Sequence, residues 1–184
     1  MIDDGQILEL INNKKTKEKG FRLLVSQTKE NLYWQIRRMV LSHEDTDDLI
    51  QEVYIKVFRN ISSFKGNSSL ATWIYRIAYN ETVNFLKNKA RQQSKYDVSL
   101  EQSMAENLQQ DRFFDSSKIN FLIEKAILSL PLKQRSVFTM RYYNNMPFKE
   151  MEQVMNTTES ALKTSYHIAE KKIKEFLLKE ELNF

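Results

Sequence analysis

The sequence predicts an all-α protein made of two small helical domains. Its 184 residues include only 3 Gly and 2 Pro, whereas average usage would give about 13 and 9. β-sandwiches, barrels, Rossmann units and P-loops require more glycine than this chain has. Apolar residues recur with helical spacing in the parts of the chain before and after residues 92–117. This spacing is lost in the Gln-rich polar stretch 92–117 itself. We therefore expect domains at 1–91 and 118–184, joined by a flexible linker.

The first domain is expected to contain three helices with a charged break after the first. They are expected at 21–41, at 47–60 and from 68 or 69 to about 89, with the break at 42–46 and a loop at 61–67. Gly66 lies in that loop, and either Ser68 or Ser69 can cap the third helix. The inward positions of the second helix are Leu49, Val53 and either Val57 or Phe58.

The second domain is expected to be a helix-turn-helix unit preceded by two helices. The four helices are expected at 119–128, 133–143, 147–155 and 158–178. Pro147 suits a first helical turn, where its missing N–H costs nothing, and Thr157 is a candidate cap for the last helix. The short connection Asn156–Thr157 has helix-turn-helix proportions.

The last helix has the distribution of apolar, polar and basic residues that is typical of a helix that reads DNA. Leu162, Tyr166, Ala169 and Ile173 form one apolar stripe, and the opposite face is short, polar and basic. A helix in the major groove reads bases with its N-terminal residues while cations hold phosphates. The candidates are Ser160, Ala161, Lys163 and Thr164 for base edges, and His167, Lys171, Arg135 and Arg141 for the phosphate backbone. The alternative is a solvated face of a plain helical bundle.

The loop around Gly66 and the helix after it combine aromatic, small polar and basic residues. Such a mixture suits unstacked bases, because rings stack on bases, amides and hydroxyls read edges, and cations hold phosphate. The candidates are Lys65, Gly66, Asn67, Ser68, Ser69, Trp73, Tyr75, Arg76, Tyr79 and Asn80. Trp73 taken alone is better explained as a core residue than as a stacking platform, whereas Tyr75, Arg76, Tyr79 and Asn80 share a polar face by helical phase.

An acidic cluster stands out in this otherwise basic half of the chain. It contains Glu44, Asp45, Asp47, Asp48 and Glu52, with Gln51 and Tyr54 alongside. Three interpretations remain open: a metal site, which no ordered ligand spacing supports; acids that favour a helix N-terminus; and a docking surface for a basic protein. DNA would be repelled here, so this face should point away from it.

Charge and composition narrow the classes of function. Residues 1–92, 93–117 and 118–184 carry net charges of +4, −3 and +3, a pattern expected of a chain that touches a polyanion at two places. The absence of Cys excludes disulfides, Cys-ligated metals and thiol catalysis. No apolar run exceeds three residues and the first residues are acidic, so we expect no membrane span, no secretory signal and a cytoplasmic location.

Two blocks of sequence resemble the extracytoplasmic-function sigma factors of bacterial RNA polymerase. The first comprises Asp47–Val53 and Phe64–Ala78; the second comprises Leu130-Pro131, Arg135, Val137, Arg141-Tyr142, Glu150-Met151, Leu162-Lys163 and His167–Ala169. The resemblance covers residues 20–91 and 118–178 in order. Where family members often carry Arg, this chain has Ser165, Ile168 and Glu170, which implies a weaker phosphate grip by the last helix.

The resemblance implies a role for each surface. Asp47, Asp48, Gln51 and Glu52 match the family's docking surface for the polymerase clamp helices, so docking becomes the favoured interpretation of the acidic cluster. The Lys65–Ser69 loop, with Arg76 and Asn80, matches the part that melts and reads the minus-ten promoter element. The Thr158–Lys171 face matches the reader of the minus-thirty-five element. An anti-sigma protein, often membrane-bound, commonly covers both domains in this family.

The resulting hypothesis is a promoter-specificity subunit without enzymatic activity, cofactor or metal. Its expected partners are bacterial core RNA polymerase, promoter DNA and an anti-sigma factor. An enzyme is disfavoured because the chain has no Cys and only two widely separated histidines, His43 and His167. The alternative is a conventional helix-turn-helix regulator that binds duplex DNA alone and never contacts polymerase.

Overall fold

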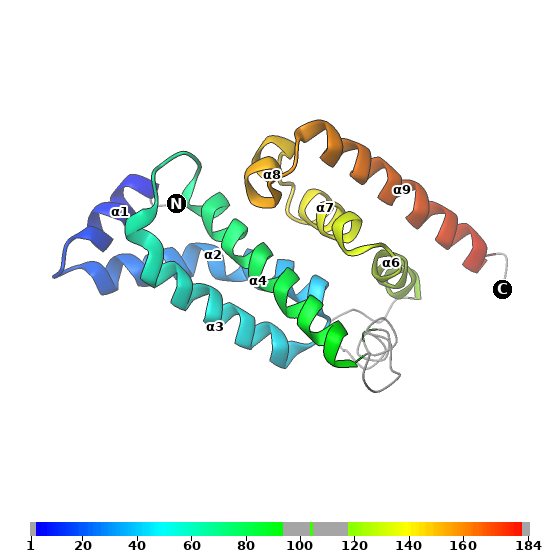
Figure 1. Ribbon diagram of the computed structural model, residues 1–184, viewed down its shortest axis with the longest axis horizontal. Helices are drawn as coiled ribbons and strands as arrows, with labels where there is room; N and C mark the ends of the chain where they lie inside the picture. Colours follow the sequence, from blue (N-terminus) through cyan, green and yellow to red (C-terminus); the bar gives the residue numbers. More distant parts are fainter. Residues whose placement is uncertain (1–2, 94–103, 105–117, 182–184) are drawn as a thin grey trace.

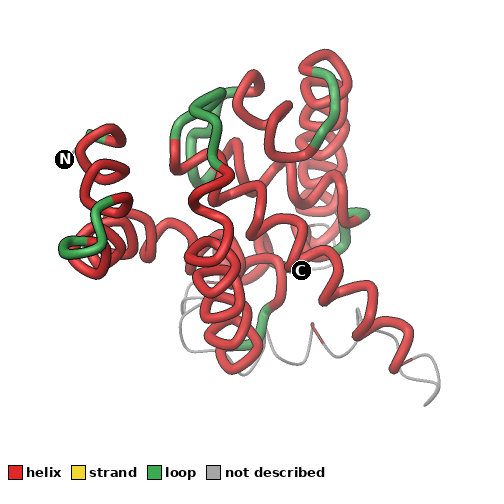
Figure 2. Tube along the Cα trace, turned by 60° about the vertical axis from the view of Figure 1, so that its left-hand side comes forward, coloured by secondary structure: helices red, strands yellow, loops and turns green. Residues whose placement is uncertain are grey.

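The computed structural model describes residues 3–93, 104 and 118–181, and the described residues are helical without a strand. The first domain consists of α1 (Asp4–Asn12), α2 (Lys17–Val40), α3 (His43–Asn60), the short 3₁₀ helix η1 (Ile61–Ser63) and α4 (Leu70–Gln93). The second consists of α6 (Lys118–Leu128), α7 (Leu132–Tyr142), α8 (Phe148–Met155) and α9 (Glu159–Glu181). Figures 1 and 2 show short loops between successive helices within each domain. The predicted all-α class is confirmed.

The predicted helices are present, with shifted ends. The second helix begins at His43 rather than Asp47, because Ser42 has extended backbone angles and its Oγ accepts a hydrogen bond from Asp45 N at 3.2 Å. The cap of α9 is Thr158 rather than Thr157, since Thr158 Oγ1 accepts from Ala161 N at 3.4 Å. The predicted linker 92–117 lies outside the described residues except for the end of α4 and Met104.

α1 is a helix that the sequence prediction did not include. Only Ile7 and Ile11 are buried along it, so its periodic signal is short. It packs across α2 at Gly20, where an added Cβ would lie 2.8 Å from Ile11 N and 2.8 Å from Leu10 Cβ. The close crossing of α1 and α2 therefore depends on the missing side chain at Gly20.

The two domains pack against each other. α8 lies beside the first half of α4, and α7 contacts α2 (Figure 1). Between α2 and α7, Asn144 Nδ2 donates to Gln35 Oε1 at 3.3 Å, and the Arg38 guanidinium lies 3.7 Å from the centroid of the Tyr143 ring. Leu128 of α6 belongs to the same buried apolar cluster as the first domain. The contact is thus partly polar and partly a shared core.

The turn between α8 and α9 closes the helix-turn-helix. Asn156 ends α8 in the left-handed conformation at φ 49°, which Asn adopts more readily than most residues. Glu152 Oε1 then accepts from the backbone N–H of Glu159 at 2.9 Å, so a side chain of α8 covers an otherwise unpaired amide of α9. These contacts fix the angle at which α9 leaves α8.

Candidate functional site

Three exposed surfaces hold the residues predicted from the sequence. The first is the acidic edge of α3, which consists of the exposed side chains Asp47, Asp48, Gln51 and Glu52. Asp47 Oδ2 lies 3.5 Å from His43 Nε2 in an exposed contact between neighbouring turns of α3. Asp45, although part of the same run, pairs with Lys89 of α4 instead. Helical spacing therefore directs four of these polar side chains outward and draws one into a contact between helices.

Tyr54 departs from the rest of the predicted docking residues because its side chain lies inside the domain. It is 9 % exposed, and its hydroxyl lies 2.8 Å from Thr28 Oγ1. Burial raises the pKa of the Tyr54 hydroxyl above its ordinary value. Only the part of the ring that lines the neighbouring groove remains available to a partner.

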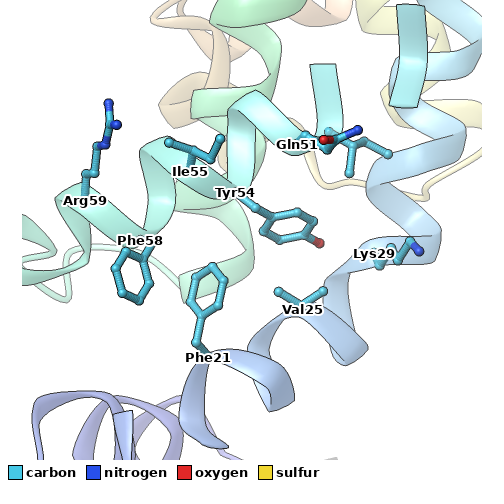
Figure 3. Close-up of a pocket in the computed structure, with 9 residues that line it drawn as sticks. Phe21, Val25, Lys29, Gln51, Tyr54, Ile55, Phe58 and Arg59 are labelled. Atoms are coloured by element: carbon cyan, nitrogen blue, oxygen red, sulfur yellow. The ribbon is translucent and has the colours of Figure 1, made fainter. Parts of the chain in front are cut away.

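An apolar groove, which the sequence prediction missed, adjoins the acidic edge (Figure 3). It has a volume of about 650 Å³, with Phe21 and Val25 of α2 on one side and Ile55 and Phe58 of α3 on the other. Ile55 is 49 % and Phe58 43 % exposed. Phe58 was one of two candidates for the core, but Val57 takes that place at 0 % exposure. Exposed large apolar side chains gathered in a groove mark an interaction surface.

The second surface is the loop that precedes α4. Lys65, Gly66 and Asn67 are exposed, and Gly66 has φ +72°, a conformation that residues with a Cβ rarely adopt. Ser69 Oγ accepts from Thr72 N at 3.1 Å and so caps α4. Trp73 is half-buried against Phe64, with ring centroids 5.6 Å apart. The Trp73 ring packs against the core of the first domain on one side and borders a cavity on the other.

A polar cavity of about 900 Å³ lies between this loop, α4 and α8. Arg76 and Asn80 reach it from α4, and Glu152, Gln153 and Asn156 line it from the second domain. The structure thus brings the loop, Trp73, Arg76 and Asn80 together around one space. Its lining carries the amides, the guanidinium and the aromatic ring that suit an unstacked base.

Tyr75 and Tyr79 share a predicted face with Arg76 and Asn80 but point elsewhere. They are half-buried and pack against the apolar cluster of α7 and α8 that includes Met151. Burial raises the pKa of both hydroxyls above the ordinary value. The predicted polar face is therefore divided, because the second domain covers its two tyrosines.

The third surface is the exposed face of α9. Thr158, Ser160, Lys163, Thr164, His167 and Lys171 are exposed on it, and Ala161 is half-buried. Lys163, Lys171 and His167 each have an acidic neighbour on the same helix. Lys163 Nζ lies 2.7 Å from Glu159 Oε1, His167 Nδ1 lies 3.0 Å from Glu170 Oε2, and Lys171 Nζ lies 3.9 Å from Glu175 Oε1. These acids reduce the positive potential that the cations offer to a phosphate.

The two arginines of α7 are less accessible than the sequence suggested. Arg135 is 6 % exposed, and its Nη1 lies 4.0 Å from Met104 Sδ. Arg141 is half-buried, donates to the Met146 carbonyl at 3.4 Å and lies 5.4 Å from the centroid of Phe148. Arg141 sits at the edge of the helix-turn-helix unit, whereas Arg135 faces the inside in this arrangement.

Within residues 3–93, 104 and 118–181, no three His, Asp or Glu side chains gather in a way that suits a metal ion. In the same part of the chain, no helix combines the length and apolar character that a membrane crossing requires.

Comparisons with known proteins match both domains. The family model of sigma-70 region 2 matches residues 24–92, and that of sigma-70 region 4 matches residues 120–173. An ECF RNA polymerase sigma-E factor of Haemophilus influenzae is 30 % identical over 76 % of this chain and 77 % of its own length. SigW of Bacillus subtilis, also an ECF RNA polymerase sigma factor, is 27 % identical over 84 % of this chain and 87 % of its own length.

Two solved structures share the fold. CnrH in complex with the cytosolic domain of CnrY superposes with a TM-score of 0.68 at 16 % identity and covers 95 % of this chain and 96 % of its own. The sigma factor RpoE in complex with the anti-sigma factor NepR from Bartonella quintana has a TM-score of 0.67 at 16 % identity, over 86 % and 97 % of the two chains.

Proposed function

Because the chain belongs to the extracytoplasmic-function sigma factors of bacterial RNA polymerase, we propose that its three exposed surfaces divide the work of promoter recognition. Residues 1–91 dock on core polymerase and open the minus-ten element, and residues 118–184 read the minus-thirty-five element. The observation that carries this proposal is the arrangement in space: acidic edge, loop cavity and basic helix face lie on separate elements, α3, α4 and α9. One chain can therefore contact polymerase and two stretches of DNA at once.

The acidic edge and the groove form the docking surface for core polymerase. Exposed carboxylates at Asp48 and Glu52 attract a basic partner and orient it, while Ile55 and Phe58 offer apolar area.

An anti-sigma factor is the second partner that we propose, because structural neighbours of this chain were solved with partners that include an anti-sigma factor. Lys29 and Arg59 border the groove and favour a partner with acidic residues there.

The side of the loop cavity formed by the first domain holds unstacked bases of the minus-ten element once α8 has moved away from α4. Lys65 and Arg76 supply positive charge, Asn67 and Asn80 supply amide donors and acceptors, and Trp73 supplies a ring on which a base stacks. Opening a promoter breaks no covalent bond. We therefore assign no enzymatic activity to the protein.

We also place the protein in the cytoplasm, where the bacterial RNA polymerase that we propose as its partner is found.

The α9 face enters the major groove at the minus-thirty-five element. Ser160, Lys163 and Thr164 are exposed near the N-terminus of α9, where a groove-bound helix meets base edges. His167 and Lys171 lie one and two turns further along, where the phosphate backbone passes.

Transcription in vitro tests the function directly. The full chain and matched core polymerase are incubated with fragments of the genome from which the sequence comes, and transcripts are mapped at their 5′ ends. Initiation at a defined set of promoters that depends on the added chain is the expected result. Core polymerase that initiates no more often with the chain than without it would contradict the proposal.

Reversing the charge at Asp48 and Glu52 tests the docking surface. Asp48→Lys with Glu52→Lys should weaken binding to core polymerase by tenfold or more, about 1.4 kcal/mol, because like charges then face the basic partner. Binding is measured by titrating labelled protein with core polymerase. Glu30→Lys with Glu9→Lys, which alters exposed acids of other helices by the same total charge, is the control. Equal affinity of the two double variants would rule out the acidic edge.

A further inference from the structure

We propose that Asp4 is a positioning residue for the Lys65–Ser69 loop. Its carboxylate accepts a hydrogen bond from the Leu70 N–H, the first backbone amide of α4, and so fixes the point at which the loop becomes helix. The inference rests on the proposed function, in which this loop holds minus-ten bases. The matched family models begin at residue 24, so they assign no role to α1.

The contact closes an open helix end. The first amides of a helix have no partner within the helix. At α4, Ser69 Oγ accepts from Thr72 N at 3.1 Å, and Asp4 Oδ2 accepts from Leu70 N at 2.7 Å. The second acceptor comes from 66 residues away in the sequence and carries a charge at the positive end of the helix dipole. Two backbone amides in the first turn of α4, directly after the loop, are thereby held in place.

Asp4 is itself held by a helix that cannot easily shift. Ile7 and Ile11 are buried in the core of the first domain. Asp3 caps α1, since its Oδ2 accepts from Gly5 N at 3.0 Å. The Thr16 hydroxyl donates to the Leu10 carbonyl at 2.9 Å, and Gly20 lets the helices meet closely. The carboxylate is therefore presented from a fixed support, as a positioning group requires.

A second carboxylate near this helix end belongs to the other domain. Thr72 Oγ1 donates to Glu150 Oε2 of α8 at 3.1 Å. That contact exists only while the domains are packed together. The Asp4 contact lies within the first domain and survives their separation, so it is the one that supports the loop when DNA replaces α8.

Two variants of Asp4 and one control separate positioning from general stability. Asp4→Ala removes the acceptor, and Asp4→Asn keeps a carbonyl oxygen. Asp3→Ala removes the neighbouring carboxylate and the cap of α1 but leaves the Leu70 contact intact. For each holoenzyme we would measure affinity for core polymerase and the fraction of open complexes on a promoter mapped as above, by permanganate reactivity of minus-ten thymines. Hydrogen exchange of the Leu70 amide is followed by NMR in the free chain.

We expect Asp4→Ala to form about tenfold fewer open complexes, equivalent to about 1.4 kcal/mol, with unchanged affinity for core polymerase. Leu70 exchange should accelerate in the same variant. Asp4→Asn should recover most of the open complexes. Asp3→Ala, which loosens the support of α1 but keeps the Asp4 carboxylate, should cause a clearly smaller loss than Asp4→Ala in both measurements.

Three results would overturn the inference. Unchanged exchange at Leu70 in Asp4→Ala would show that the contact does not protect this amide. Equal losses of core binding and promoter opening would show a role in stability alone. The same opening defect in Asp3→Ala would assign the effect to α1 in general. A wild-type holoenzyme that opens no promoter would instead contradict the proposed function. The inference would then fail as well, whatever the rate of hydrogen exchange at the Leu70 amide.

Discussion

Gly66 shows how a single residue sets the shape of the loop before α4. Its φ of +72° is unfavourable for residues with a Cβ, yet an added Cβ would meet no heavy atom within 4 Å. Substitution therefore strains the backbone and causes no collision. Because the loop is exposed, it can relieve that strain by changing shape, at little expense to the rest of the domain.

We expect Gly66→Val to impair promoter opening more than folding. A β-branched residue at this φ costs about 1–2 kcal/mol, and the loop would relax away from the geometry that holds bases. Permanganate reactivity at the minus-ten element and thermal unfolding measure the two effects. Gly66→Asn is the matched variant, since Asn tolerates the left-handed conformation. Normal open complexes in Gly66→Val would count against the loop assignment.

Acidic residues of α9 reduce the positive charge of the face that we propose reads DNA. Glu159→Gln removes the charge 2.7 Å from Lys163 Nζ, and both side chains are exposed, so the effect is screened by solvent. We expect holoenzyme affinity for promoter DNA to rise by about two- to fivefold at low salt and to approach the wild-type value as salt increases.

The control is Glu9→Gln, which makes the same change of net charge at an exposed residue of α1. Promoter affinity is measured by fluorescence anisotropy over a salt series. An equal gain in both variants would mean that net charge, and not the neighbourhood of Lys163, controls binding.

At the scale of elements, the crossing of α1 and α2 at Gly20 leaves no room for an added side chain. Gly20→Ala would place Cβ 2.8 Å from the Ile11 backbone nitrogen, which cannot swing aside. We expect the free energy of unfolding to fall by about 1–3 kcal/mol, as overpacked cores do. Urea unfolding measures the loss.

Gly5→Ala provides the contrast, because its Cβ would meet only the Asp3 carboxylate at 2.9 Å, the end of a side chain that can move. Alanine also favours a helix more than glycine by about 1 kcal/mol. This variant should be neutral or stabilising. Equal destabilisation by both substitutions would contradict the close crossing as its cause.

The elements also show which features a sequence can predict. α2, α3, α4 and the helices of the second domain could be predicted because apolar residues recur along them over several turns. α1 could not, since Ile7 and Ile11 are its only buried residues. Helical phase placed Tyr75 and Tyr79 beside Arg76, but the element that covers the tyrosines, α8, comes some 70 residues later in the chain. The apolar groove was missed for a similar reason, because it needs α2 and α3 together.

At the scale of the whole molecule, a polar cluster of Glu124, Tyr143 and Arg38 joins the domains. Glu124 of α6 has a side chain only 12 % exposed; its Oε1 accepts from the Tyr143 hydroxyl at 2.8 Å and lies 4.0 Å from Arg38 Nε of α2. Burial raises the pKa of the Glu124 carboxyl above its ordinary value, although Tyr143 and Arg38 oppose the shift. The folded chain therefore holds a proton at Glu124 more tightly than the unfolded chain does.

This shift predicts a decline in stability as pH rises from about 4.5 through the raised pKa of Glu124, because the folded state binds more protons than the unfolded state in that window. The contribution is present below the ordinary pKa and lost above the raised one. Glu124→Gln should remove it, so the difference in unfolding free energy between variant and wild type should grow with pH. A difference that stays constant from about pH 4.5 to about pH 7 would contradict the assignment.

The packing of α8 against Tyr75, Tyr79 and Thr72 has a consequence for every affinity measured on the free chain. If α8 must leave before bases reach this side of α4, the dissociation constant observed equals the intrinsic one divided by the open fraction. A chain that is open one time in a hundred binds promoter strands a hundredfold more weakly than its contacts allow. Any partner that held the two domains apart would restore that factor without adding a single contact to the DNA.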